Sequence, residues 1–189
     1  MKPGTILLLN GTSSSGKTTL LHLLQEALDS PFLEFGLDKV IWMLPRRYFY
    51  PPLWDEVLGK ADRAGAFGHQ LIQGLHRAMR TLSENGLNVL ADHVLVEPAW
   101  ALDLAEQLSD LPAYLIGIQS SLEILEQREK SRKDRTLGQA RAQFDLVHAH
   151  GFYDFTVNSG ESSAEESLEQ ILQFLKNNPS PQALQKIKT

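Results

Sequence analysis

The 189-residue sequence contains no cysteine, no excess of basic residues and no long hydrophobic run. Without cysteine the chain has neither disulfides nor thiolate metal sites, and this agrees with a reducing cytoplasm. The 18 lysines and arginines are outnumbered by 23 aspartates and glutamates, so the net charge of −5 argues against nucleic acid as a partner. No stretch approaches the roughly 20 apolar residues of a membrane helix. The apolar run near the N-terminus is also too short for a signal peptide. We therefore expect a soluble, cytoplasmic protein with no membrane partner.

Short apolar runs alternate with segments of helical periodicity along most of the chain. We expect strands at 5–9, 32–35, 87–91, 113–118 and 152–157, and helices at 18–28, 68–82, 98–108, from 120 onward and at 163–176. Capping boxes at Ser120 with Glu123, and at Ser163 with Glu166, predict where the last two helices begin. The alternation predicts an α/β protein with a parallel sheet covered on both faces. The length favours one domain over residues 1–178, and the order of the tail at 179–189 is left open.

The segment GTSSSGKT at residues 11–18 matches the phosphate-binding pattern G-x-x-x-x-G-K-[ST] between an expected strand and an expected helix. Small residues allow the backbone N–H groups to form an anion nest, to which the helix adds its positive dipole end. Lys17 would reach the β- and γ-phosphates, and the Thr18 hydroxyl would bind Mg²⁺. The alternative is a flexible turn with a surface lysine. The predicted nucleotide-binding residues are Gly11, Thr12, Ser13, Ser14, Ser15, Gly16, Lys17, Thr18 and Thr19.

Two aspartates follow or end expected strands near this loop. Asp38 comes shortly after the second strand, at the edge of the sheet where ligands of α/β proteins bind. A carboxylate there can take the proton of an alcohol during phosphoryl transfer, although an aspartate that caps a helix or forms a turn is an equally good explanation. Asp92 ends the third strand and suits a magnesium role better than a helix cap or a salt bridge. His93 is either a substrate contact or a packed core residue.

Further candidates come from a charged segment, an aromatic segment and a histidine pair. Arg128, Arg132 and Arg135 share one helix face and either clamp the transferring phosphoryl group from a lid at about 125–141 or form a solvated face. Residues 42–67 hold many aromatics, beginning with Trp42, and suggest a wall around a substrate. His148 and His150 are a weak metal signal, and a helix end facing the site is preferred, so their role is left open.

The chain resembles the chloramphenicol phosphotransferases over roughly residues 5–175. The resemblance rests on LLNGTSSSGKTTLL, FLEFGLDKVIWMLP, VLADHVL, REKSRKDRTLGQA and VHAHGFYDFTVNS. It implies a three-layer P-loop kinase fold, with a five-stranded parallel sheet in the order 2-3-1-4-5 and a helical lid. It also implies transfer of the γ-phosphate of ATP onto the primary hydroxyl of chloramphenicol. By this resemblance Asp38 matches the catalytic base, Lys17 and Thr18 the phosphate and Mg²⁺ contacts, and Arg135 a lid arginine.

Two segments depart from the family pattern. Asp92-His93 stands where the family has an acidic pair, and residues 42–68 differ in length and content. We therefore expect a kinase that uses ATP and Mg²⁺ to phosphorylate a small-molecule alcohol. We expect its biological role to be antibiotic resistance. The alternatives are a kinase for another alcohol or a nucleoside, and a nucleotide-binding switch without transfer activity. The acceptor, the choice between ATP and GTP, and the oligomeric state, a homo-oligomer included, are left open.

Overall fold

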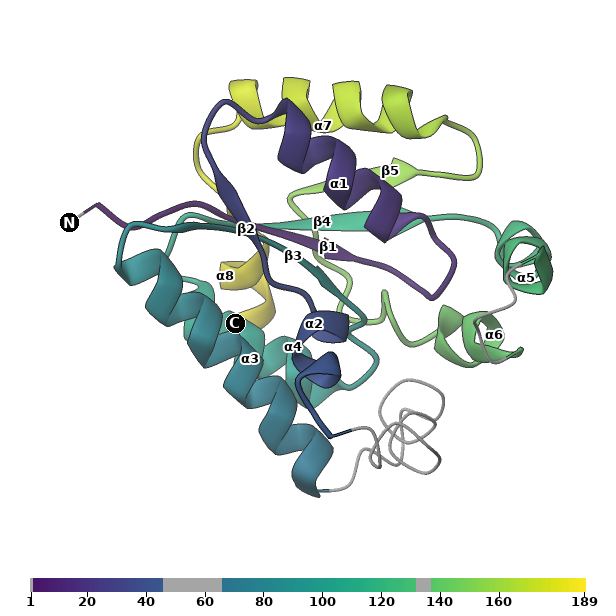
Figure 1. Cartoon of the computed structure of the whole chain (residues 1–189), viewed down its shortest axis with the longest axis horizontal. Helices are drawn as coiled ribbons and strands as arrows, with labels where there is room; N and C mark the ends of the chain where they lie inside the picture. The colour runs from purple at the N-terminus through teal and green to yellow at the C-terminus, as the bar shows by residue number, and fades with distance from the viewer. Residues whose placement is uncertain (1, 46–65, 132–136) are drawn as a thin grey trace.

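A five-stranded parallel sheet organises the chain (Figure 1). The structure is a computed structural model that describes residues 2–45, 66–131 and 137–189. The strands are β1 (Ile6–Asn10), β2 (Phe32–Glu34), β3 (Asn88–His93), β4 (Ala113–Gln119) and β5 (Phe155–Asn158). Their order, β2-β3-β1-β4-β5, confirms the expected topology. The central strand β1 is buried along its whole length because both of its faces are covered, as its unbroken apolar run requires.

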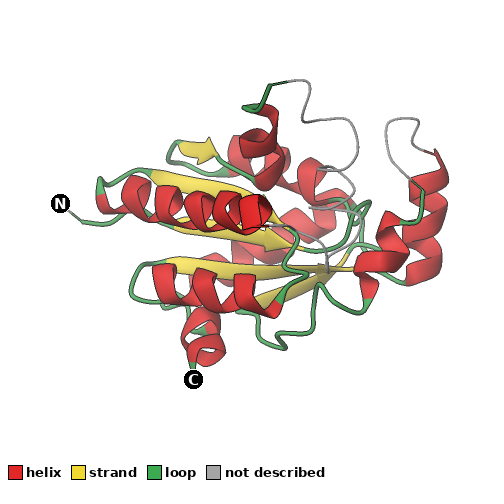
Figure 2. Cartoon of the chain, turned by 90° about the horizontal axis from the view of Figure 1, so that it is seen from below, coloured by secondary structure: helices red, strands yellow, loops and turns green. Residues whose placement is uncertain are grey.

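Helices cover the sheet on both faces, which gives three layers (Figure 2). One face carries α1 (Lys17–Ala27) and α7 (Ala164–Asn177), whose Leu21, Leu24 and Ile171 pack with the strands. The other face carries α3 (Ala66–Glu84), α4 (Pro98–Leu108) and α8 (Ala183–Lys188), which bury Ile72 and Trp100. The remaining helices are α2 (Leu37–Trp42), α5 (Leu122–Ser131) and α6 (Gln139–Phe144). No helix in the described ranges is long and apolar enough to cross a membrane.

The capping box expected at Ser120 and Glu123 is wrong. The helix begins one residue later than that box requires, and the Ser121 hydroxyl accepts from the Ile124 N–H at 3.4 Å. Within the described residues, the expected long helix is instead two short ones, α5 and α6. The second box, at Ser163 and Glu166, is confirmed, with both of its hydrogen bonds formed.

The C-terminal tail, whose order the sequence left open, forms helix α8 and packs into the core. Ala183 and Leu184 are each only 2% exposed. Asp154, just before β5, fixes the start of the helix because its Oδ1 accepts from the backbone N–H groups of Gln182 at 2.6 Å and Ala183 at 2.9 Å. The tail has little helical periodicity of its own. It is ordered by the burial of Ala183 and Leu184 and by the capping carboxylate of Asp154, which comes from a distant loop.

Candidate functional site

The loop between β1 and α1 has the backbone shape of a phosphate-binding nest. Ser14 and Gly16 have left-handed backbone angles, with φ of 63° and 90°, which bends the loop tightly before α1 begins at Lys17. At Gly11 a side chain is excluded because its Cβ would lie 2.5 Å from the Ile118 carbonyl oxygen. The glycines of the motif are thus required by a close approach at one end of the loop and by a positive φ at the other.

Several polar groups of this loop are buried. The Lys17 side chain is 7% exposed, and its ammonium donates to the carbonyl oxygens of Gly11 and Thr12, both at 2.7 Å. The hydroxyls of Ser13, Ser14 and Ser15 are buried without a hydrogen-bond partner in the described part of the protein. Buried polar atoms are nearly always paired, so these hydroxyls indicate a polar ligand that the loop is built to bind.

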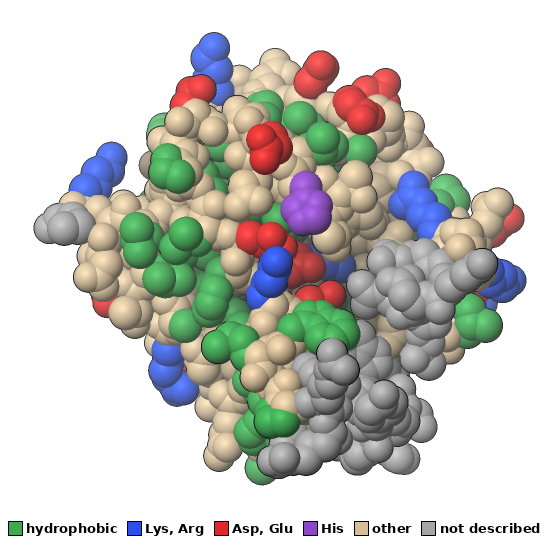
Figure 3. Space-filling model, in the orientation of Figure 1, with side chains coloured by type: hydrophobic (Ala, Val, Ile, Leu, Met, Phe, Trp, Pro, Cys, Tyr) green, Lys and Arg blue, Asp and Glu red, His purple; other side chains and the backbone are tan. Residues whose placement is uncertain are grey.

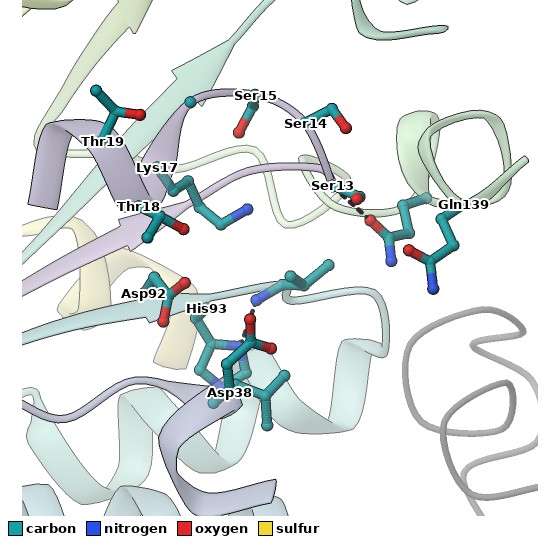
Figure 4. Close-up of a pocket in the computed structure, with 14 residues that line it drawn as sticks. Ser13, Ser14, Ser15, Lys17, Thr18, Thr19, Asp38, Asp92, His93 and Gln139 are labelled. Carbon is teal, nitrogen blue, oxygen red and sulfur yellow. Dashed lines mark hydrogen bonds between the residues drawn. The ribbon is translucent and has the colours of Figure 1, made fainter. Parts of the chain in front are cut away.

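A pocket opens beside the loop and brings together residues that are far apart in the sequence. We call it the phosphate-loop pocket (Figure 4). Its lining includes the predicted residues Lys17, Thr18, Asp38, Asp92 and His93. The complete lining is Ser13, Ser14, Ser15, Gly16, Lys17, Thr18, Thr19, Leu37, Asp38, Asp92, His93, Val94, Gln139 and Gln143. The expected meeting of the two aspartates with the loop therefore takes place at the carboxyl ends of β1, β2 and β3.

Asp92 and Asp38 carry interacting negative charges in this pocket. Burial raises the pKa of Asp92, the nearby positive charge of Lys17 opposes that rise, and the negative charge of Asp38 adds to it. The Asp92 carboxylate lies so close to Gly36 that a Cβ there would fall 1.8 Å from its Oδ1. Gly36 therefore allows the loop after β2 to pass directly over Asp92, which brings α2 and Asp38 to the pocket.

Asp38 is the second residue of α2 and does not cap it. The N-cap is Gly36, and no side chain makes a capping hydrogen bond there. An ion pair between Lys39 and Glu34, at 3.2 Å, ties the start of α2 to β2, and His22 lies 3.9 Å from the same glutamate. Figure 3 shows acidic and basic side chains meeting beside a histidine near the centre of the face over β2 and α2.

Because the N-cap of α2 is Gly36, the capping explanation for Asp38 is excluded, and the catalytic role of Asp38 stays a prediction.

His93 belongs to a buried chain of hydrogen bonds. The Val94 N–H donates to His93 Nδ1 at 2.8 Å, so the ring proton is on Nε2, which lies 3.0 Å from His76 Nε2. His76 then donates from Nδ1 to Asp103 Oδ2 at 2.6 Å. Burial lowers the pKa of both histidines, for His93 well below its ordinary value, while Asp103 opposes the shift at His76. Both His93 nitrogens have partners within the protein, so its predicted substrate contact is left with the carbon edge of the ring.

Arg128 lies on the other side of the phosphate loop. Its guanidinium donates to the Ser159 carbonyl oxygen at 2.6 Å and to the Ser159 hydroxyl at 3.2 Å. These groups line a second hollow, the side pocket, together with residues of the phosphate loop and α1. Its lining is Ser14, Ser15, Gly16, Thr19, Leu20, Ile118, Arg128, Ser131, Ser159, Ser162, Ser163, Ala164 and Ser167. The structure thus places Arg128 on the α1 and α7 side of the loop, away from Asp38 and Asp92.

Other predicted residues lie at the margin of the described structure or outside it. Arg132, Arg135 and residues 46–65 of the expected substrate wall are outside the described residues. Trp42 ends α2 and is 63% exposed. The lid and the roles of these residues stay predictions.

The histidine pair, His148 and His150, lies close to Asn10, the last residue of β1. His148 Nδ1 is 2.6 Å and His150 Nε2 is 3.1 Å from the Tyr153 hydroxyl, to which Asn10 donates at 2.7 Å. Burial, with the charges of His150 and Lys17, lowers the pKa of His148 to about 4. In the described ranges no group of three or more His, Asp or Glu side chains is arranged to hold a metal ion. The cluster links Asn10, the residue before the phosphate loop, to the segment after α6.

Two buried glutamines of α6 were not identified from the sequence. Gln143 Oε1 accepts from the Ser13 N–H of the phosphate loop at 2.7 Å, and the Gln139 side-chain nitrogen is buried without a hydrogen-bond partner in the described part of the chain. Buried Glu129 of α5 fixes α6 by accepting from the N–H groups of Gly138 at 2.7 Å and Ala140 at 2.9 Å. The only sequence signal was the spacing of four residues between the glutamines, which is common on any helix.

Comparisons with known proteins identify a matching family and similar sequences. Residues 4–176 match the model of a family described as chloramphenicol phosphotransferase-like protein. Relatives from two strains of Mycobacterium tuberculosis, which carry the provisional name O-phosphotransferase, are 28% identical over 204 residues, covering 100% of this chain and 89% of theirs.

Several solved structures with a similar fold are described as kinases. The APS kinase of M. tuberculosis, in complex with AMPPNP and APS, has a TM-score of 0.68 at 16% identity, with 93% of this chain and 99% of that one covered. Shikimate kinase from Acinetobacter baumannii, in complex with shikimate, has a TM-score of 0.61 at 17% identity, with 94% and 96% covered. At such identities the likeness shows the fold alone.

Proposed function

Because the chain belongs to the chloramphenicol phosphotransferase-like family, we propose that it is a Mg-ATP-dependent kinase for a small-molecule alcohol, with chloramphenicol or a similar antibiotic as the first candidate acceptor. Family and fold support an O-phosphotransferase of the P-loop kinase type. The donor, the metal and the acceptor are our proposal. The observation that carries it is the meeting of Lys17, Asp38 and Asp92 in one pocket beside the phosphate nest. We also propose that the enzyme acts in the cytoplasm.

The phosphates would lie in the nest between Ser14 and Thr18, and the nucleoside would extend into the side pocket past Arg128. Lys17 would exchange its two carbonyl partners for oxygens of the β- and γ-phosphates. Phosphoryl transfer depends mainly on positioning and charge, so the buried ammonium is the main protein group that stabilises the charge developing on the transferred group.

Asp38 is the proposed general base. The acceptor hydroxyl donates its proton to the Asp38 carboxylate while its oxygen bonds to the γ-phosphorus. The bond from that phosphorus to the oxygen of the leaving ADP breaks in the same step, so the products are a phosphate ester and ADP. Asp38 lines the pocket from α2, across from Lys17, where an acceptor would lie between them.

The residues present also fit Mg²⁺. Thr18 and Asp92 offer a hydroxyl and a carboxylate in one pocket, and Mg²⁺ prefers one or two such oxygen ligands together with phosphates and water. Burial and the charge of Asp38 disfavour the ionised form of Asp92 and raise its pKa, so a nearby cation would relieve this cost. When bound, Mg²⁺ would neutralise charge on the β- and γ-phosphates.

An acceptor screen tests this proposal. The protein is incubated with Mg²⁺ and either ATP or GTP, alone and with chloramphenicol, shikimate, gluconate or nucleosides, and ADP or GDP release and product masses are recorded. Acceptor-dependent release, together with an acceptor that has gained one phosphoryl group, supports a kinase and identifies its substrate and donor. Slow release that no acceptor accelerates supports the nucleotide-binding switch instead. Lys17→Ala protein is the inactive control.

A further inference from the structure

The Gln139 side chain is a buried hydrogen-bond donor without a partner at the edge of the phosphate-loop pocket. It is 3% exposed, lines this pocket, and its amide nitrogen makes no hydrogen bond with any described residue. An amide buried in this way costs stability unless a ligand pairs with it. Its neighbour Gln143 differs because its oxygen is held by the Ser13 N–H at 2.7 Å.

Gln139 sits on a well-anchored element. It is the first residue of α6, and the two N–H groups that flank it, those of Gly138 and Ala140, are both held by the buried Glu129 carboxylate. Gln143 then fastens the same helix to the phosphate loop through Ser13. The backbone at Gln139 is therefore held at one place relative to the loop, so its side chain extends from a fixed point, as a recognition group requires.

The position of Gln139 favours the acceptor over the triphosphate. Figure 4 shows Gln139 near Ser13, at the end of the pocket away from Thr18 and Thr19 where the helix N-terminus would hold phosphates. A neutral amide is a weak partner for a polyanion, whereas the charges of the phosphates are matched by Lys17. Asp38 lines the same pocket, and its carboxylate would repel an acceptor that carries a carboxylate or phosphate.

On the basis of the proposed function, we propose that Gln139 determines acceptor specificity by donating its amide N–H to an oxygen of the acceptor. The acceptor is then a neutral alcohol with a second oxygen, a hydroxyl or a carbonyl, close to the hydroxyl that is phosphorylated. Chloramphenicol has such oxygens and is the first probe. A site built around a hydrogen bond to its substrate rejects analogues that lack the partner, because its own polar group is then left unpaired.

The test compares Gln139→Leu with wild type and with Gln173→Leu, a matched change at an exposed glutamine of α7. For Gln139→Leu we expect kcat/KM for chloramphenicol to fall about three- to tenfold, the usual value of one neutral hydrogen bond. The KM for ATP and the affinity for AMPPNP should not change. The thermal midpoint should stay equal or rise, because leucine replaces an unpaired buried amide with an apolar group of similar size. Gln173→Leu should change none of these.

Each contrary outcome has a distinct meaning. Unchanged acceptor kinetics in Gln139→Leu overturn the inference and leave the proposed function intact. Weaker AMPPNP binding with an unchanged acceptor KM assigns the amide to the nucleotide, and a lower thermal midpoint with equal losses for ATP and acceptor assigns it a structural role. Either result overturns the inference. If wild type phosphorylates a different neutral alcohol, that compound replaces chloramphenicol as the probe. Phosphorylation of anionic acceptors alone contradicts the inferred substrate class. Wild type that phosphorylates nothing refutes the proposed function, and the inference falls with it.

Discussion

Asp38→Asn separates a kinase from a nucleotide-binding module. The substitution keeps the size of the side chain and removes the proton acceptor. Since Asp38 lines the pocket opposite Lys17 and does not cap α2, asparagine should leave the phosphate nest and the helix start intact. We expect kcat for acceptor phosphorylation to fall by about 10²–10⁴, the usual effect of losing a positioned general base.

The effect on stability and on ATP binding should be small. Asp38 lies in the first turn of α2, where a negative charge is worth about 0.3–1 kcal/mol against the helix dipole. Removing that charge also relieves its repulsion of Asp92, whose pKa it raises. These two effects oppose each other, so we expect the free energy of unfolding to change by no more than about 1 kcal/mol. The loss should therefore appear in kcat and not in the KM for ATP.

The assay is steady-state ADP release with varied ATP and saturating acceptor, alongside thermal unfolding. Asp29→Asn, at an exposed position just after α1, is the matched control and should behave as wild type. Wild-type turnover by a folded Asp38→Asn protein would remove the base from the mechanism. Equal losses in ATP binding and in turnover would show that Asp38 acts on the nucleotide.

Three further changes test other parts of the site. Lys17→Ala should lower transfer by about 10²–10³, measured as ADP release by folded protein, because it removes the buried ammonium beside the nest; normal turnover would contradict the phosphate-loop assignment. Glu129→Ala should cost about 1–3 kcal/mol in urea unfolding, since two backbone N–H groups at the start of α6 lose their acceptor. It should also speed hydrogen exchange at residues 137–141, and protection that stays the same would argue against this anchor. His148 has its pKa lowered from 6.5 to about 4, so its neutral form contributes stability above about pH 6.5 that is lost as the pH falls toward 4. The thermal midpoint of wild type should therefore fall more steeply over this range than that of His148→Asn, and parallel curves would exclude His148 as a source of acid sensitivity.

The sheet could be predicted from the sequence because parallel strands with both faces covered are continuous apolar runs. The phosphate loop could be predicted because its glycines, lysine and threonine are fixed by the chemistry of polyphosphate. The meeting of Asp38 and Asp92 followed from the rule that the carboxyl ends of parallel strands share one edge of the sheet.

The remaining features depend on contacts between distant segments. Gln139 and Gln143 look like ordinary helix residues, and only folding brings them to Ser13. The sequence left His93 open between a substrate contact and a packed residue, because its partners, His76 and Asp103, lie on helices whose packing no local pattern reveals. The order of the tail could not be predicted because the carboxylate of Asp154 that starts α8 is 28 residues away from Gln182.

The most direct test of the central claim follows the γ-phosphoryl group itself. ATP radiolabelled at the γ-phosphorus is incubated with Mg²⁺, chloramphenicol and either wild-type or Asp38→Asn protein, and the products are separated by chromatography. We predict that wild type transfers the label to the acceptor and that the asparagine variant does so at least about 10²-fold more slowly. Label that appears only as inorganic phosphate, or equal transfer by both proteins, would contradict a kinase in which Asp38 is the base.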